Sequence, residues 1–353
     1  MLRKTLLILL LLLIYCDQLN AFNYSFHELG TLDSHHQSLA NKINDSGQII
    51  GWSGKAFIYD KGVIVDFGTS GGFVYGAAGI NNSGQVVGTF LNNDNDSRAY
   101  VYKEGVFTNL GTLGGQTSHA SGINSFGYIV GGARDSTGEV RPYLYKNGFM
   151  IDIGSLGGLG SADDINDYGQ IAGTSLLASG EGPHAFIYDN GLMIDIGTLG
   201  GSESYAHSIN NSGHIVGTAY NSLGNYRAFL YINDTMIDIG TLGGGLRSAA
   251  QDINDFGQIV GESQNKNEEP RAFIYQDGQM FDLNDFVPSY HNFTLSEARG
   301  INNYGDIVGA GYYRNDTIIS RAFLLFNNDA QRIIPEPLSI ILLLIACTSI
   351  RKH

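Results

Sequence analysis

One short phrase occurs seven times in this chain, and its repetition constrains the fold more than any other feature. The phrase is Ile-Asn-x-x-Gly, followed one residue later by two apolar residues and a second Gly. Its copies begin at Ile43, Ile80, Ile123, Ile165, Ile209, Ile253 and Ile301, which are 37 to 48 residues apart. Self-similarity at such a period is the signature of a repeat architecture, in which each unit is one supersecondary motif.

Each unit also holds two other recurring phrases. One is a basic residue or His, a small residue, an aromatic residue and an apolar run; its copies begin at Lys55, Arg98, Arg141, His184, Arg227, Arg271 and Arg321. The other is Asp-Ile-Gly-Thr-Leu-Gly-Gly, clearest at Asp152, Asp195 and Asp238, with looser copies at Glu28, Asp66, Asn109 and Asp282. Because the basic residue recurs in every unit, we expect a structural role, with a bridge to a repeat Asp or to loop carbonyls.

The three phrases predict four short strands, which we name a, b, c and d. Asn-x-x-Gly between apolar stretches is typical of a hairpin on a type I turn with Gly in the left-handed conformation, and it joins a to b. The aromatic phrase is strand c, with apolar residues on both faces. Turn signals at 60–62, 147–148, 190–191 and 277–278 then lead into strand d. Four strands in roughly 43 residues match one propeller blade.

Seven units therefore predict an all-β fold, a seven-bladed β-propeller. No third phrase follows the last strand c, Arg321–Phe326, whereas a stray copy at His27–Leu32 precedes the first strand a. We expect this N-terminal segment to complete the last blade, so that the ring closes without open edges. A β-solenoid is the alternative fold, although its coils usually take roughly 20–30 residues.

Composition narrows the possible partners. The net charge is −14, and Lys and Arg form no cluster, so the basic footprint of a nucleic-acid-binding protein is missing. Hydrophobic residues make up 43% of the chain in regular spacing, which can bury a core and argues against disorder. The two cysteines, Cys16 and Cys347, lie in the terminal segments. The region between them therefore holds no disulfide framework.

The sequences of both ends of the chain are typical of targeting segments. Residues 1–21 combine Arg3 and Lys4 with the apolar run Leu6–Ile14 and end at Ala21, as a secretory signal peptide would. Cys16 offers an alternative, a lipoprotein cysteine, but Tyr15 before it fits that signal badly. Residues 334–353 hold Pro335, Glu336 and Pro337, an apolar stretch and a basic end, an order typical of a stop-transfer signal. Residues 22–333 form the propeller between them.

The tail resembles the PEP-CTERM sorting signals of Gram-negative bacteria. The resemblance rests on Pro335, Glu336 and Pro337 with the apolar stretch and Arg351 behind them. It implies processing by an exosortase-like membrane enzyme, transient or retained anchoring in the membrane, and a cell-surface or extracellular location in bacteria that make exopolysaccharide and biofilm. The apolar stretch, Leu338–Ile350, is shorter than the roughly 20 residues of a comfortable membrane span.

The repeats resemble the HAF family of extracellular repeats, named for a phrase that stands here as His184-Ala185-Phe186. The resemblance covers about residues 27–326 and includes the divergent last unit. It implies a secreted or surface protein. It supplies no established activity and no catalytic residues.

The loops of such a meander alternate between two faces. The b–c loops share a face with the d–a loops and vary most between units, from three residues at 52–54 to eleven at 310–320. Because variable loops on a rigid scaffold usually carry binding, this face is the predicted recognition surface. Six tyrosines near or within these loops either stack on sugars or pack between blades: Tyr75, Tyr205, Tyr220, Tyr226, Tyr312 and Tyr313.

Two acidic groups stand out from the repeat. Asn92, Asp94 and Asp96 resemble the start of a calcium loop, but the Gly and the distal Glu of that motif are missing, and a solvated polar loop is the simpler interpretation. Asp163 and Asp164 interrupt the repeat just before Ile165, as a catalytic carboxylate pair or as a solvated surface pair. The chain has no GxSxG elbow, HExxH pair or glycine-rich phosphate loop, so no catalytic residue, metal or cofactor is predicted.

These features predict an exported, non-enzymatic surface or matrix protein that presents variable loops to a polysaccharide or protein partner in the envelope or biofilm. The alternative is a secreted carbohydrate-active enzyme, a hydrolase or lyase with Asp163 and Asp164 as acid and base. A periplasmic sensor or assembly scaffold is a third possibility.

Overall fold

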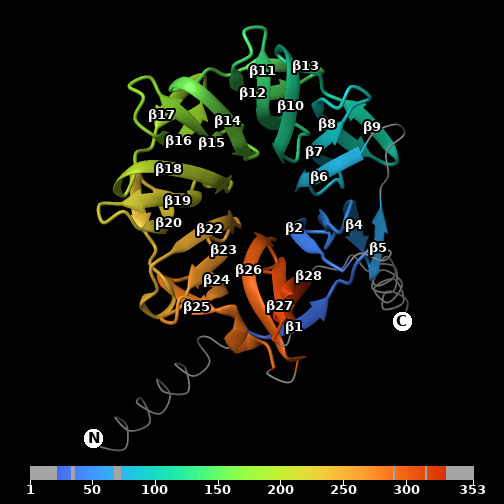
Figure 1. Cartoon of the computed structure of the whole chain (residues 1–353), viewed down its shortest axis with the longest axis vertical. Helices are drawn as coiled ribbons and strands as arrows, with labels where there is room; N and C mark the ends of the chain where they lie inside the picture. Colours follow the sequence, from blue (N-terminus) through green and yellow to red (C-terminus); the bar gives the residue numbers. More distant parts are fainter. Residues whose placement is uncertain (1–21, 33–35, 67–72, 289–290, 315, 331–353) are drawn as a thin grey trace, which may run out of the picture.

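Seven four-stranded antiparallel sheets surround a central axis in a computed structural model that describes residues 22–32, 36–66, 73–288, 291–314 and 316–330 (Figure 1). The fold is the predicted seven-bladed β-propeller. The predicted signal peptide with Cys16 and Ala21, and the tail with Pro335, Glu336 and Pro337, lie outside the described residues. No helix in the described ranges is long and apolar enough to span a membrane.

Each blade is numbered in chain order, and its strands run from the axis outward. Blade 1 is β2 (Leu39–Ile43), β3 (Ile49–Trp52), β4 (Ala56–Asp60) and β5 (Val63–Asp66); blade 2 is β6 (Phe73–Ile80), β7 (Val86–Leu91), β8 (Ser97–Lys103) and β9 (Val106–Asn109). Blade 3 is β10 (Gly114–Ile123), β11 (Ile129–Asp135), β12 (Val140–Lys146) and β13 (Phe149–Asp152); blade 4 is β14 (Gly157–Ile165), β15 (Ile171–Leu177), β16 (Pro183–Asp189) and β17 (Leu192–Asp195).

The remaining blades follow the same order until the last one. Blade 5 is β18 (Gly200–Ile209), β19 (Ile215–Asn221), β20 (Tyr226–Ile232) and β21 (Thr235–Asp238); blade 6 is β22 (Ser248–Ile253), β23 (Ile259–Gln264), β24 (Pro270–Gln276) and β25 (Gln279–Asp282). Blade 7 is β26 (Phe293–Ile301), β27 (Ile307–Tyr313), β28 (Asp316–Asn327) and β1 (Tyr24–Glu28). Two short 3-10 helices, η1 (Leu242–Gly244) and η2 (Leu283–Phe286), lie between the strands of neighbouring blades.

The N-terminal strand closes the ring. β1 pairs antiparallel with β28, with Tyr24 opposite Asn327 and Glu28 opposite Phe323, so it is the outermost strand of blade 7 (Figure 1). Glu28 also lies 3.4 Å from the guanidinium of Arg321, in the place that a repeat Asp takes in other blades. The predicted strand exchange is confirmed.

The turns between strands have the backbone conformations that the repeated phrases predict. In every a–b turn the Gly has a φ between 73° and 82°, and its N–H donates to the carbonyl of the Asn three residues earlier. The c–d turns hold two successive residues with positive φ, as at Lys61 with Gly62 and Asn147 with Gly148. That geometry is the tight turn whose twist suits antiparallel strands. Both turn predictions are confirmed.

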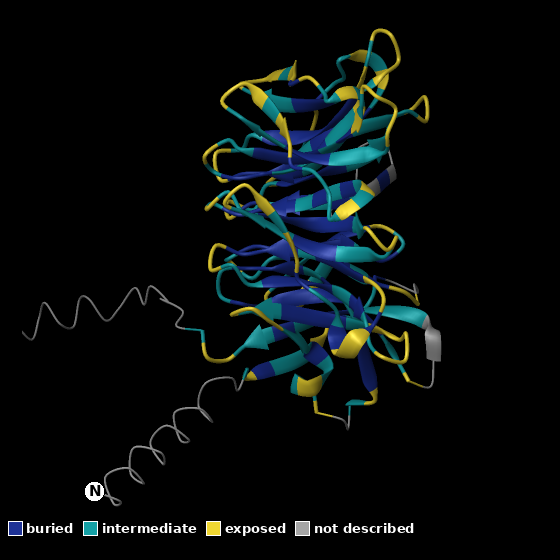
Figure 2. Ribbon diagram, turned by 90° about the vertical axis from the view of Figure 1, so that its left-hand side faces the viewer, coloured by how far each residue is buried: buried dark blue, intermediate teal, exposed yellow. Residues whose placement is uncertain are grey.

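The hydrophobic core is divided into seven clusters, one between each pair of neighbouring blades. Between blades 2 and 3, for example, Val87 packs with Ile123 and Tyr143. Within each blade, the second Gly of the phrase lets the two inner strands approach closely, because a Cβ at Gly217 would stand 2.0 Å from the carbonyl oxygen of Tyr205. The buried layers between the sheets are visible edge-on in Figure 2.

The recurring basic residue makes the predicted bridge in five blades. Its partner is the acid of the third phrase in the pairs Lys55–Asp66, His184–Asp195, Arg227–Asp238, Arg271–Asp282 and Arg321–Glu28, at 2.9 to 3.7 Å. Arg98 pairs with Asp96 instead, since blade 2 has Asn109 at the acidic position. Arg141 turns to Asp135 and Glu139 of its own b–c loop. These partly exposed pairs fix geometry more than they stabilise the fold.

Candidate functional site in the axial channel

Every inner strand carries a β-bulge at the same place. The register between the inner strand and its neighbour shifts by one residue just before the Ile-Asn phrase, in all seven blades. The residue before each bulge is a buried Ala: Ala40, Ala77, Ala120, Ala162, Ala206, Ala250 and Ala298. The extra residues, which we call the bulge ring, are Asn41, Ala78, Ser121, Asp163, His207, Gln251 and Arg299. A bulge of this kind re-aims a side chain.

The bulge ring lines a cavity in the axial channel. All seven of its members border a space of about 570 Å³, together with Lys42, Glu297 and Thr89. That volume falls within the range of small-molecule sites, roughly 300–1,000 Å³. Because the bulges precede the a–b turns along each inner strand, this cavity lies on the side of the channel that faces the d–a and b–c loops.

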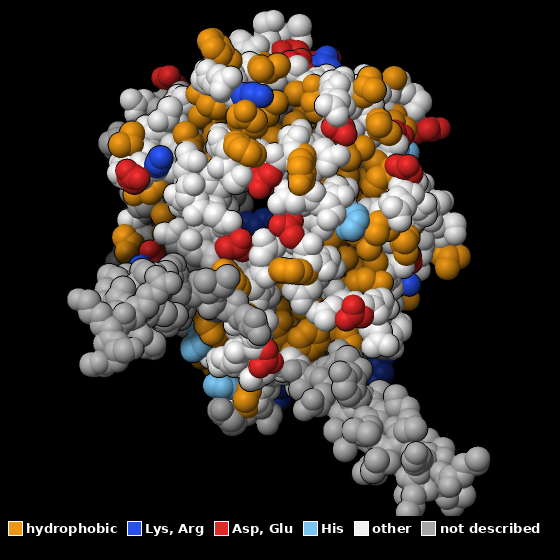
Figure 3. All heavy atoms as spheres, turned by 180° about the vertical axis from the view of Figure 1, so that it is seen from behind, with side chains coloured by type: hydrophobic (Ala, Val, Ile, Leu, Met, Phe, Trp, Pro, Cys, Tyr) orange, Lys and Arg blue, Asp and Glu red, His pale blue; other side chains and the backbone are white. Residues whose placement is uncertain are grey.

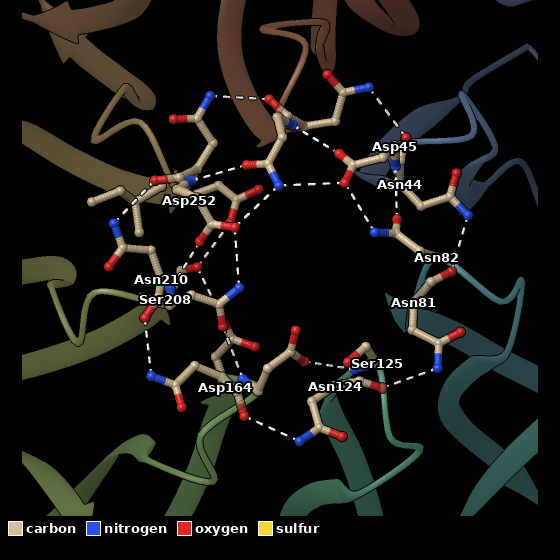
Figure 4. Close-up of a pocket in the computed structure, with 18 of the residues that line it drawn as sticks. Asn44, Asp45, Asn81, Asn82, Asn124, Ser125, Asp164, Ser208, Asn210 and Asp252 are labelled. Carbon is tan, nitrogen blue, oxygen red and sulfur yellow. Dashed lines mark hydrogen bonds between the residues drawn. The ribbon is translucent and has the colours of Figure 1, made fainter. Parts of the chain in front are cut away.

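The other end of the channel is lined by a ring of asparagines, which we call the turn ring: Asn44, Asn81, Asn124, Asn166, Asn210, Asn254 and Asn302. Each amide NH₂ donates to the backbone carbonyl of the turn-ring Asn in the next blade, at 3.0 to 3.1 Å, and Asn302 donates to Asn44, so the circle is complete (Figure 4). Each amide oxygen accepts two backbone N–H groups of its own turn, as Asn210 does from Ser212 and His214. The repeated Asn is therefore structural.

The next residue of each turn builds a second circle with one gap. In six of these seven residues the backbone N–H donates to the side-chain oxygen of the corresponding residue in the following blade, at 2.8 to 3.0 Å. The seven residues are Asp45, Asn82, Ser125, Asp167, Asn211, Asp255 and Asn303. The gap falls between Asn82 and Ser125, where the serine side chain is too short to reach. Both circles border a polar cavity of about 190 Å³.

A charged network separates the two rings. The ammonium of Lys42 lies 2.6 Å from Asp252, and Asp252 and Asp164 raise the pKa of Lys42 although burial works in the opposite direction. The hydroxyl of Ser208 is 2.9 Å from Asp164 and 2.8 Å from Asp252. One hydroxyl proton serves only one of these contacts. The Ser208 hydroxyl therefore joins the two carboxyl groups, while burial raises the pKa of Asp164 and the nearby Lys42 ammonium partly offsets that rise.

The room for a side chain on each inner strand determines which blades contribute to this network. Lys42, Asp164, Ser208 and Asp252 each stand directly before the Ile of the repeated phrase. In the other three blades this position is Gly, at Gly79, Gly122 and Gly300. A Cβ at Gly122 would stand 2.9 Å from the Cα of Asp164, so the neighbouring blade excludes a side chain there. Charged residues at this position in blades 1, 4 and 6 therefore depend on glycines elsewhere in the same circle.

Asp163 and His207 lie in adjacent blades and face the bulge-ring cavity. Burial raises the pKa of Asp163 to about 8, and the Thr174 hydroxyl that donates to it at 3.4 Å only partly offsets this. Nδ1 of His207 lies 2.7 Å from the carbonyl oxygen of Ala250, so this nitrogen carries the proton. Burial lowers the pKa of His207, which keeps the ring neutral and leaves Nε2 as a hydrogen-bond acceptor.

Other polar groups of the bulge ring also keep unused hydrogen-bonding capacity. Within the described part of the chain, the side chains of Ser121 and Gln251 make no hydrogen bond, and Nε of Arg299 is buried without a partner. The other guanidinium nitrogens of Arg299 contact Asn41 at 3.1 Å and Glu297 at 2.9 Å. A concave space with a few convergent polar groups is a typical binding site.

The structure corrects the interpretation of Asp163 and Asp164. They are not a solvated surface pair, because both lie in the axial channel. They also face different compartments: Asp163 borders the bulge-ring cavity, while Asp164 is held by the backbone N–H groups of Ile165 and Ile209 beside the turn ring. The Ala-x-x-Ile-Asn pattern, present in all seven units, was the signal that could have located the bulge ring.

The other candidates occupy packing or turn positions. Tyr205, Tyr220, Tyr226, Tyr312 and Tyr313 are half-buried; the rings of Tyr220 and Tyr226 lie 5.6 Å apart, and Tyr313 packs edge-on against Phe293. The side chain of Tyr75 lies outside the description. Asn92 accepts the backbone N–H groups of Asp94 and Asp96, which makes a hairpin turn. No group of three or more His, Cys, Asp or Glu within the described ranges could hold a metal ion.

The a–b face carries aromatic residues that the sequence analysis did not single out. Phe126, Tyr168 and Phe256 occupy the same turn position in three blades and are 68%, 78% and 76% exposed. Figure 3, which looks along the axis from behind, shows acidic and hydrophobic side chains around the central opening. Because Phe126, Tyr168 and Phe256 lie in a–b turns, their exposed rings stand on the face opposite to the predicted recognition loops.

Comparisons with known proteins bear on the fold. Residues 202–331, from within β18 to the end of blade 7, match a family described as a protein of unknown function (DUF3466). No curated protein matches the chain. Among solved structures it is similar to a streptogramin B lyase, with 13% identity, a TM-score of 0.51, and coverage of 88% of this chain and all of that one.

Two other solved structures are similar over most of the propeller. The extracellular domain described as that of a one-component system from B. thetaiotaomicron is 12% identical, with a TM-score of 0.54 and coverage of 86% of this chain and 40% of that one. TolB from Acinetobacter baumannii is 12% identical, with a TM-score of 0.46 and coverage of 84% and 65%. The chain spans less than two thirds of either protein. At such identities the likeness concerns the fold alone.

Proposed function

We propose that this chain is an exported, non-enzymatic binding protein whose propeller holds part of a polysaccharide or protein partner in the bulge-ring cavity and over its d–a and b–c rim. One observation carries the proposal. The same bulge in seven blades presents seven side chains of six chemical kinds — amide, methyl, hydroxyl, carboxyl, imidazole and guanidinium — to one cavity, and the side chains of Ser121 and Gln251 make no hydrogen bond within the described residues. The variable b–c loops stand around this entrance and extend the contact surface.

The separation of Asp163 from Asp164 supports binding over hydrolysis by that carboxyl pair. Asp163 faces the cavity, but Asp164 is engaged by two backbone N–H groups and by Ser208 on the other side of the bulge. The pair predicted for a carbohydrate-active enzyme is thereby split. Glu297, which also borders the cavity, is paired with Arg299.

The chain ends supply the cellular context of the proposal. The signal-like residues 1–21 and the tail with Pro335, Glu336 and Pro337 support export and handling by an exosortase-like enzyme, with transient or retained anchoring at the cell surface. The resemblance to HAF repeats supports the same extracellular setting. Bacteria with such sorting signals make exopolysaccharide, which makes a glycan the first ligand to test.

The test is a glycan-array and soluble-oligosaccharide screen on the purified protein, with product analysis of each mixture. We expect binding without product, lost in a Ser121→Ala/Gln251→Ala variant and retained in a Ser125→Ala variant, which changes the turn instead. Product formation would overturn the non-enzymatic assignment. Failure to bind any glycan, together with no envelope partner in crosslinking, would overturn the proposal as a whole.

A further inference from the structure

We infer that the bulge-ring cavity recognises a protonated primary amine on a hydroxylated ring, that is, an amino sugar, with the ammonium between Asp163 and His207. This inference rests on the proposed function and names the chemistry of the ligand. It follows from the ion pairs and hydrogen bonds that each carboxyl group of the channel makes.

Within the described residues, Asp163 makes no ion pair with a basic side chain, and it receives fewer hydrogen bonds than Asp164 or Asp252. Asp252 is paired with Lys42 at 2.6 Å, and Glu297 with Arg299 at 2.9 Å. Asp164 receives two backbone N–H groups. Asp163 has only the hydroxyl of Thr174, at 3.4 Å, and burial holds its pKa near 8. A cation arriving at this carboxyl group would replace the missing counter-charge and stabilise the ionised form.

The adjacent blade adds a second acceptor. The proton on Nδ1 of His207 is committed to the carbonyl of Ala250, so Nε2 offers a lone pair to the cavity. An ammonium group has three N–H donors and no acceptor, and its donors match a carboxylate beside an imidazole lone pair. Lys42 and Arg299 also line the cavity, but they are paired with Asp252 and Glu297. An anionic group would therefore meet Asp163 without an unpaired cation among the described lining residues.

The rest of the ring suits hydroxyl groups. Ser121 and Gln251 flank the Asp163–His207 pair on either side, in blades 3 and 6, and each both donates and accepts hydrogen bonds. A sugar hydroxyl can pair with each of these groups, whereas a purely aliphatic amine would leave them unsatisfied. The ligand is therefore both cationic at one position and polyhydroxylated.

Isothermal titration calorimetry of the purified protein tests this inference, with D-glucosamine, N-acetyl-D-glucosamine, D-glucose, D-glucuronate and ZnCl₂ as separate probes near pH 7. We expect glucosamine to bind at least about tenfold more tightly than the acetylated and neutral sugars, a difference of about 1.4 kcal/mol. Asp163→Asn should remove that preference while leaving glucose affinity within about threefold. Asp167→Asn, the same change four residues later in the turn of the same blade, should leave the preference intact.

Three outcomes would overturn the inference. Equal affinity for glucosamine and its acetylated form, or loss of preference in Asp167→Asn but not in Asp163→Asn, would place the amine elsewhere. Binding of Zn²⁺ that is lost in Asp163→Asn, without any amino-sugar preference, would make the pair a metal site. In each case, binding of other sugars that the Ser121→Ala/Gln251→Ala variant abolishes would leave the proposed function standing, so the two failures are distinguishable.

Discussion

The turn ring and the bulge ring are built by the same seven inner strands, three residues apart, yet they differ in kind. The turn ring repeats one residue seven times, and every amide group in it is hydrogen-bonded to its own turn or to the next blade. The bulge ring uses a different residue in each blade, and several of its polar groups have no partner within the described residues. In this chain, the residue that is repeated in every blade has a structural role. The residue that varies between blades, at the bulge, forms the candidate site.

The largest expected effect comes from the charged network between the rings. Lys42→Met removes the cation that faces Asp252 and Asp164, and an uncompensated buried charge usually destabilises by about 3–5 kcal/mol. Urea unfolding near pH 7 measures the loss. Burial raises the pKa of Asp164, so protonation of this group removes one of the two negative charges and the difference from wild type should shrink as the pH falls. An unchanged midpoint would show that Lys42 belongs with the binding residues instead.

Breaking the turn ring should come next in size. Asn210→Ala removes two hydrogen bonds within its turn and the link to the carbonyl of Asn254, all in a buried setting. We expect a loss of about 2–4 kcal/mol in unfolding free energy. Asn211→Ala, the neighbouring and less buried position, serves as the control with a smaller loss. A change below about 0.5 kcal/mol at Asn210 would contradict the structural role of the ring.

Asp163→Asn should stabilise the protein, in a pH-dependent way. With a folded pKa of about 8 and an unfolded pKa near ~3.9, the native state retains a proton that the unfolded chain releases between these values. Wild-type stability therefore falls as the pH rises from about 4 to 8, by at most about 1.4 kcal/mol per pH unit. The Asn variant lacks that loss, so it should be more stable than wild type at pH 8 and about equal to it at pH 4.

Denaturant unfolding at several pH values measures this difference, with Asp167→Asn as the matched control in the same blade. Parallel pH profiles for wild type and Asp163→Asn would mean that Asp163 is an ordinary solvated carboxylate. A binding residue such as Asp163 is expected to lower the stability of the free protein, because binding sites are often kept at some cost in stability.

Filling the gap in the second turn circle should give a smaller gain. Ser125→Asn places an amide oxygen where the N–H of Asn82 lacks the acceptor that its counterparts have in the other blades. One added hydrogen bond is expected to stabilise by about 0.5–1.5 kcal/mol. Thermal unfolding of this variant beside Ser125→Ala separates the gained bond from the loss of the serine. A destabilised Asn variant would show that the gap is required.

Gln251→Ala should have the smallest effect on stability. The Gln251 side chain makes no hydrogen bond within the described residues, so its removal is expected to change the unfolding free energy by less than about 0.5 kcal/mol. Its role would appear only in ligand affinity. A loss of stability comparable to that of Asn210→Ala would erase the distinction between the two rings.

The sequence predicts the fold well because the phrases encode local geometry directly. Asn-x-x-Gly specifies a turn, and the stray segment at His27–Leu32 supplies the strand that blade 7 lacks, so the number of blades and the ring closure follow. The bridge from Arg227 to Asp238 follows in the same way from repeated positions.

The site was harder to predict, because it depends on a bulge. A strand with strict alternation would point Asp163 and Asp164 to opposite faces, but nothing in two adjacent acids says that an extra residue turns one of them toward the axis. The exposed aromatic residues at Phe126 and Tyr168 also belong to turns whose sequence varies freely. Alignment of the seven units on the Ala before each bulge brings out the variable position.

The most direct test of the account is a crystal structure of the protein soaked with glucosamine, glucose and glucuronate in separate experiments. The account predicts sugar density in the axial channel, with the amine of glucosamine against Asp163 and His207 and hydroxyl groups at Ser121 or Gln251. Density only on the b–c loops or beside the exposed rings of Phe126, Tyr168 and Phe256, with no sugar in the channel, would contradict the claim that the bulge ring is the binding site.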